Sequence, residues 1–171
     1  MSSMTPNPFD LVSGRLWDLA ESHPDVARLV KPGNRVRFDR PQGAPIKEEI
    51  ADGDLPELVL LPDGATFGLL RTSASSSVVK RYSWIVATGD FRTPTINAIE
   101  WALFCAMLNA QGVLGALTWE NASFVKRVDL LELTEGFADS ERNRGIRGWS
   151  AVSKVEVEMH FRTATLLGWL A

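Results

Sequence analysis

Cysteine and histidine are scarce in this chain of 171 residues, and their scarcity limits the chemistry that it can hold. The single cysteine, Cys105, excludes an intramolecular disulfide and any site built from several cysteines. It falls in an apolar segment, where a cysteine usually packs as a small hydrophobe. Only two histidines are present, His23 before a proline and His160 in a strand-like segment, and both are interpreted as surface or capping residues. The sequence therefore shows no nucleophile paired with a base, as covalent catalysis requires.

An excess of basic charge is also lacking. Lysine and arginine number 18 against 21 aspartates and glutamates, so the net charge is −3. Sequence-specific nucleic-acid binding is therefore not expected, and no glycine-rich nucleotide motif occurs. Apolar runs stay below the roughly 18 residues of a membrane span, and the N-terminus lacks the basic and apolar regions of a signal peptide. We expect a protein made in a reducing cytoplasm, with no membrane partner.

What remains is the composition of one globular domain, with 45% apolar and 23% charged residues. The clearest element is the strand predicted for residues 149–162. Apolar side chains occupy most of its odd positions and polar ones most of its even positions, as in Val155-Glu156-Val157-Glu158. This alternation is typical of a sheet with one buried and one solvated face.

Turn and capping residues place the other elements. Asn7-Pro8 and Thr93-Pro94 are cap-plus-proline signals that open helices, with Gly112 as the stop of the second. The helices are predicted at 9–20, 24–30 (a short helix or turn) and 96–110, and the strands at 34–39, 57–61, 66–72, 78–88 and 125–134. The serine-rich stretch near Ser75 is expected to be the tip of a long hairpin.

These elements predict a single α+β domain over residues 1–171, in the order α-β-β-β-α-β-β. A mostly antiparallel sheet is expected to carry two main helices packed on one face. Residues 1–8 are interpreted as a flexible N-terminus, and residues 163–171 as an apolar C-terminal tail that docks on this core or on a neighbouring subunit.

Two charged segments are candidate sites. Six acids and no base lie between Glu48 and Asp63, and Asp52-Gly53-Asp54 at their centre could hold a divalent cation, although a solvated loop is the simpler interpretation. The loop over residues 136–148 could grip phosphates or carboxylates through three arginines, or be solvated. Its balanced charge favours a protein partner. The arginines are Arg142, Arg144 and Arg147.

The six tryptophans divide into two groups. Trp17, Trp84 and Trp101 fall inside elements, where a core position is expected. The others lie near element ends, where aromatic residues beside arginines are typical of interfaces. They are Trp119, Trp149 and Trp169.

The order of elements resembles the phage tail-terminator, or tail-completion, family. The similarity is one of layout over roughly residues 9–162. An N-terminal helix precedes an early strand with a Pro/Gly-rich connection, and the strand Tyr82-Ser83-Trp84-Ile85-Val86 leads straight into the helix 96–110. The strand 125–133, a polar loop and the strand 149–161 follow.

This resemblance implies a virion tail protein, made in the bacterial cytoplasm, that forms a ring, typically a hexamer. The ring would end the tail tube and join it to the head connector, without catalysis, cofactor or metal. Its partners would be copies of itself and the tail-tube and head-connector proteins. In that setting Arg142, Arg144, Arg147 and Trp149 are predicted interface residues.

Two other functions stay open. The first is a small α+β ligand-binding or regulatory domain, which predicts a closed apolar pocket between the helices and the sheet. The second is an enzyme that uses the acidic cluster with a metal, through Asp52 and Asp54.

Overall fold

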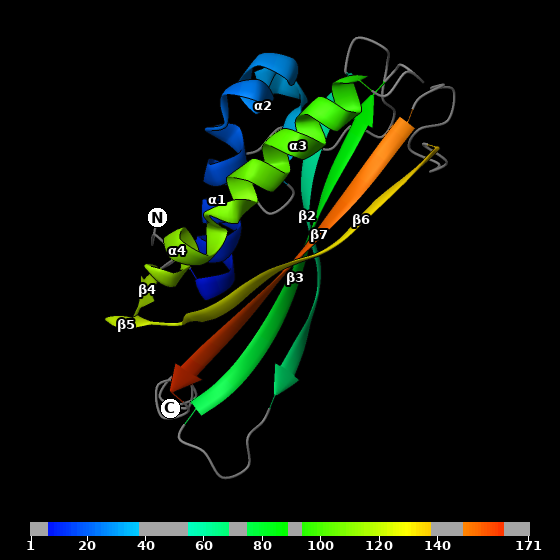
Figure 1. The fold of residues 1–171 in the computed structure, drawn as a ribbon. Coiled ribbons are helices and arrows are strands. Elements are labelled where there is room, and N and C mark those ends of the chain that lie inside the picture. The colour runs from blue at the N-terminus through cyan, green and yellow to red at the C-terminus, as the bar shows by residue number, and fades with distance from the viewer. Residues whose placement is uncertain (1–6, 38–54, 69–74, 89–93, 138–148, 163–171) are drawn as a thin grey trace, which may run out of the picture.

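The computed structural model describes residues 7–37, 55–68, 75–88, 94–137 and 149–162. Its fold is α+β, with a mixed five-stranded sheet and a small two-stranded one (Figure 1). The elements are α1 (Pro8–Glu21), α2 (Pro24–Leu29), the 3-10 turn η1 (Pro32–Asn34), β1 (Arg35–Arg37), β2 (Glu57–Gly68), β3 (Ser75–Thr88), α3 (Pro94–Leu108), α4 (Ala110–Gly115), β4 (Thr118–Trp119), β5 (Ala122–Ser123), β6 (Val125–Phe137) and β7 (Trp149–Arg162).

The main sheet has the strand order β1-β2-β3-β7-β6. β1 runs parallel to β2, and every other neighbouring pair is antiparallel, which confirms the expected mostly antiparallel sheet. β2 and β3 form the expected long hairpin, whose strands are paired out to Gly68 and Ser77. The serines from Ser75 to Ser77, expected at its tip, instead belong to β3, where they pair with β7. In β7, Val155, Val157 and Met159 are buried, as the alternation predicted.

The helices lie on one side of this sheet, and the core fills the space between (Figure 1). α3 packs against β3 and β7, and α1 packs against α3. Trp17 of α1 stacks on Trp84 of β3 with ring centroids 5.7 Å apart, and both are buried as expected. The Tyr82 hydroxyl donates a hydrogen bond to the Phe9 carbonyl at 3.2 Å. No helix within the described segments is long and apolar enough to cross a membrane.

The start of α1 corrects the limit of the N-terminal segment. Residues 1–8 were expected to be flexible, but the helix begins at Pro8 and Asn7 is its N-cap. The Asn7 side chain accepts a hydrogen bond from the Asp10 backbone N–H at 3.0 Å, which satisfies one of the free donors of the first turn. The remaining residues, 1–6, lie outside the described part.

Removing this cap is expected to weaken the protein measurably. Asn7→Ala should lower the free energy of unfolding by about 1 kcal/mol, because the Asp10 N–H loses its acceptor. Urea unfolding followed by circular dichroism measures the change. Asn7→Ser keeps an acceptor at the cap without placing a second carboxylate beside that of Asp10, which accepts a hydrogen bond from the Asn7 side chain at 2.8 Å, and should stay within about 0.5 kcal/mol of the original; an equal loss in both variants would contradict the cap.

β2 is longer than predicted because it passes through Pro62-Asp63-Gly64 instead of ending there. Pro62 pairs with Tyr82 and Ala65 with Lys80, so two residues of β2 oppose one of β3. Gly64, at φ +85°, absorbs this bulge in a conformation that few other residues adopt. The residues Pro62-Asp63-Gly64, predicted to end the strand, therefore form a bulge within it.

The region after α3 also differs from the prediction. Gly112 does not stop the helix: α3 ends at Leu108, and α4 continues to Gly115. Ala110 and Leu114 are fully buried, so tertiary packing maintains the additional helix. The small hairpin β4–β5 was missed. Glu120 and Asn121 both have positive φ, as a two-residue hairpin turn requires.

Candidate interaction surface

Helix α3 is apolar on both sides, and only one side faces the sheet. Ile96, Ile99 and Leu103 are buried in the core. On the opposite side Trp101, Phe104 and Leu108 follow at helical spacing and are 64%, 40% and 67% exposed. The rings of Trp101 and Phe104 stack with centroids 5.5 Å apart. The expected core position of Trp101 is therefore wrong: its ring lies on the surface.

Strand β6 extends this apolar surface at the edge of the sheet. Leu130 pairs with Val155 and Glu132 with Lys154, so Leu131 is an additional, bulged residue. Leu130 and Leu131 are 43% and 50% exposed. We call the five side chains the α3–β6 surface: Trp101, Phe104, Leu108, Leu130 and Leu131.

The size of the α3–β6 surface is typical of a binding surface. Its two aromatic rings alone expose on the order of 200 Å². The three leucines bring the patch into the range of ~300–600 Å² that is often functional in monomeric proteins. A helix that is apolar all round is normally buried, so the exposed side of α3 favours contact with another molecule.

A groove of about 390 Å³ lies between α3 and the sheet, within this surface. Trp101, Phe104 and Leu131 line it, together with Trp84, Glu100 and Ser153. The last three are at least nine-tenths buried. Among the residues that the structure describes, the Trp84 indole N–H has no acceptor. Burial of an unpaired donor costs about 1–3 kcal/mol, so an acceptor supplied from outside would be favoured there.

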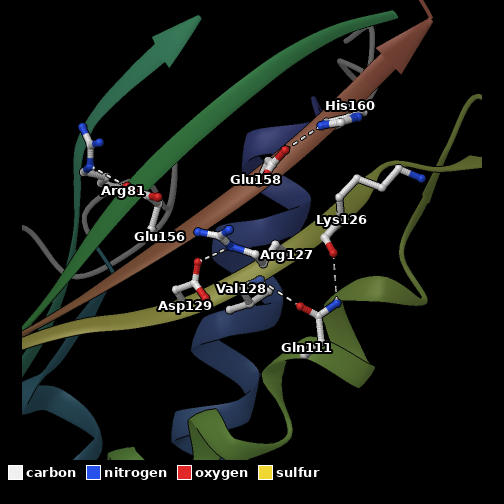
Figure 2. Close-up of polar contacts among 9 residues, drawn as sticks. All are labelled: Arg81, Gln111, Lys126, Arg127, Val128, Asp129, Glu156, Glu158 and His160. Atoms are coloured by element: carbon white, nitrogen blue, oxygen red, sulfur yellow. Dashed lines mark hydrogen bonds and ion pairs between the residues drawn. The ribbon is translucent and has the colours of Figure 1, made fainter. Parts of the chain in front are cut away.

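Gln111 covers only one part of the exposed edge of β6 (Figure 2). Its side chain reaches from α4, accepts a hydrogen bond from the Val128 N–H at 2.8 Å and donates one to the Lys126 carbonyl at 3.4 Å. β6 is the outermost strand of the main sheet, so among the described strands none covers its outer edge. The uncovered part of the edge from Asp129 onward begins next to the α3–β6 surface, and such edges readily accept another strand.

The opposite face of the sheet is polar and internally paired (Figure 2). Arg81 of β3 bonds Glu156 of β7 at 2.9 Å, and Glu158 bonds His160 at 2.7 Å. Arg127 and Asp129 form a third pair on β6. The hydrogen bond and charge of Asp129 raise the pKa of Arg127 above its usual value. These six side chains thus have partners within the sheet.

Breaking one of these pairs is expected to have a small effect. Arg81→Gln should lower the free energy of unfolding by at most about 1 kcal/mol, since the Arg81 side chain is 41% exposed. Thermal unfolding at low and high salt measures it, and the difference should shrink at high salt because ions screen the pair. A larger loss that salt does not change would contradict this interpretation.

Most of the predicted site residues lie outside the described residues. Arg142, Arg144 and Arg147 are among them, so their contacts stay a prediction. Trp149 is the first residue of β7, where it pairs with Thr88. This places its backbone inside the sheet, and its role at an interface stays a prediction.

The remaining candidates for chemistry are distributed over the molecule. The Nδ1 atom of His23 accepts a hydrogen bond from the Asp25 N–H, which confirms the capping role. Of the acidic segment 48–63, Glu57 is buried and Asp63 accepts a hydrogen bond from Ser83, while Asp52 and Asp54 lie outside the described part. Within the described residues no group of three metal-ligating side chains gathers.

Comparison with known proteins gives no family for this chain. A scan against models of protein families and a search of curated proteins both find no match.

Proposed function

We propose that this chain is a non-catalytic assembly protein of a tailed phage or prophage. It forms a ring that ends the tail tube and joins it to the head connector. Its partners are copies of itself and the tail-tube and head-connector proteins, and its place is the virion tail. The observation that carries this proposal is the α3–β6 surface. The phage assignment rests on the resemblance in element order to tail-terminator proteins.

The position of the α3–β6 surface supports self-association. It lies at the β6 edge of the sheet, whereas three residues of the other edge strand, β1, are described. A contact that joins this surface to a different surface of the next copy is heterologous, and such contacts generate rings when the rotation closes. Arg142, Arg144, Arg147 and Trp149 are proposed as further contacts between subunits or rings.

Termination of the tube follows from the same geometry. An open tube can continue to add subunits, because each bound copy presents a new face for the next. A ring that binds the tube through one face and has a different second face stops that growth. This function needs complementary surfaces and no reactive groups.

The ring proposal is tested by assembly. Light scattering after size exclusion, from about 1 to 300 µM, should show a concentration-dependent rise from monomer to one closed oligomer. Electron microscopy should then show rings at the ends of tail tubes assembled from the tube protein of the same genome, and shorter tubes in their presence. A chain that stays monomeric over this range and also fails to bind tubes would contradict the proposal.

A second function is favoured by the groove itself. Its volume of about 390 Å³ falls in the range of small-molecule sites. If the protein binds an apolar ligand as a monomer, the dye 8-anilinonaphthalene-1-sulfonate should bind at one saturable site. The Phe104→Asp variant should no longer bind the dye. Binding that disappears when the protein associates would instead favour the assembly function.

A further inference from the structure

We propose that the groove of the α3–β6 surface receives residues 166–170 (Leu-Leu-Gly-Trp-Leu) of a second copy of this chain. The inference rests on the proposed function and names the contact by which copies hold one another. The segment lies in an extended form beside the uncovered part of β6, with its large side chains in the groove. Each copy thus gives one segment and receives another.

The groove has the chemistry that this segment needs. Its aromatic and leucine side chains offer an apolar lining that includes Trp84, whose buried N–H has no acceptor among the described residues. An extended backbone brings carbonyl groups that can accept a hydrogen bond from this N–H. Beside the groove, the edge of β6 from Asp129 onward can pair with an added strand, as in other proteins that bind peptides by strand addition.

The segment in turn has the chemistry that the groove selects. Residues 163–171 contain no charged side chain, and four of the five residues from 166 to 170 are leucine or tryptophan. Exposure of such a run to water is unfavourable, and covering it stabilises the contact by about 25 cal/mol per Å² of apolar area buried. It follows directly on Arg162, the last residue of β7.

Distance limits how much of the segment can enter the groove of its own copy. The near end of the groove is at Leu130, which pairs with Val155, seven residues before Arg162 in the same strand. This separation is roughly 23 Å at the ~3.3 Å rise of a strand. Leu166 and Leu167, four and five residues past Arg162, reach at most about 18 Å even when fully extended. Of the large side chains of the segment, Leu166 and Leu167 thus fall short of the groove of their own copy, and only Trp169 and Leu170, at most about 25–29 Å past Arg162, reach its near end. A second copy can place all four in the groove.

Disulfide trapping between two variants tests this contact. Cys105→Ser removes the only cysteine, and on that background one protein carries Leu131→Cys and the other Gly168→Cys. After mixing under mild oxidation, we expect the mixed disulfide to form at least tenfold faster than in a control pair. In the control, Ala27→Cys on the exposed surface of α2 replaces Leu131→Cys.

A second variant pair measures the contribution of the segment in the full chain. Trp169→Asp should weaken self-association at least tenfold, because it places a charge in the groove. Thr163→Asp adds the same charge next to Arg162, outside residues 166–170, and should change association less than threefold. Thermal unfolding of dilute protein should be the same for both, since neither residue belongs to the described core.

The outcomes separate this inference from the proposed function. Rings that form normally, with trapping no faster than in the control pair, would overturn the segment exchange and leave the ring proposal intact. A chain with both cysteines that closes its own disulfide at a rate independent of concentration would also overturn exchange between copies. Fast mixed trapping in a protein that never binds tubes would support the exchange and contradict the proposed function.

Discussion

Trp84→Ala is expected to lower the free energy of unfolding by about 3–5 kcal/mol, the largest effect of any single substitution considered. Trp84 is 0% exposed and stacks on Trp17. Its removal takes away the ring contact between β3 and α1 and leaves a cavity beside the groove. Urea unfolding measures the change, and thermal unfolding should show a fall in midpoint of roughly 10 °C.

Two controls identify the physical cause. Trp101→Ala removes the same side chain from a site that is 64% exposed and should cost no more than about 1 kcal/mol. Trp84→Phe keeps an aromatic ring and removes the indole N–H that lacks an acceptor among the described residues, so it should cost less than Trp84→Ala. If both tryptophan-to-alanine variants lost equal stability, the contrast in burial would be contradicted.

The periodicity of apolar residues correctly predicted those elements whose pattern is compatible with one structure only. In β7, alternation over many residues fixes which side chains face the core, because a slip by one residue would bury Glu156 and Glu158. The strand bounds Trp149–Arg162 agree with the prediction for this reason. The α+β class follows from this strand together with the predicted helices, which can cover its apolar face.

Local turn residues were less informative, because the same residues are compatible with more than one structure and tertiary packing selects between them. Pro62-Asp63-Gly64 can end a strand or form a bulge, and pairing of the residues that follow with β3 selects the bulge. Gly112 can stop a helix, but burial of Leu114 maintains α4 beyond it. Neither long-range contact is visible in the residues near the turn.

The α3–β6 surface was missed although the sequence contains a signal for it. Within the predicted helix 96–110, Trp101, Phe104 and Leu108 share one face, opposite to Ile99 and its neighbours. A helix with two apolar faces has one more than a single sheet can cover. The sequence could not show which face the sheet takes, since that depends on how α1 and β3 pack around it.

Trp101→Ala is expected to weaken self-association at least about 30-fold, which corresponds to a loss of about 2 kcal/mol. Its ring is 64% exposed, stacks on Phe104 and lies at the mouth of the groove. Large aromatic side chains at the centre of an interface commonly dominate the free energy of binding. Light scattering and sedimentation over the concentration range of assembly give the dissociation constants.

Phe67→Ala is the matched control for this substitution. Phe67 is also 64% exposed, but it lies on β2 and lines a different pocket, with Phe9 and Trp119. Because both variants remove an exposed aromatic ring, a general effect of surface hydrophobicity would weaken association equally in the two. We expect Phe67→Ala to change the dissociation constant less than threefold. Equal weakening would contradict a specific role of the α3–β6 surface, whereas the expected difference ties assembly to the second apolar face of α3.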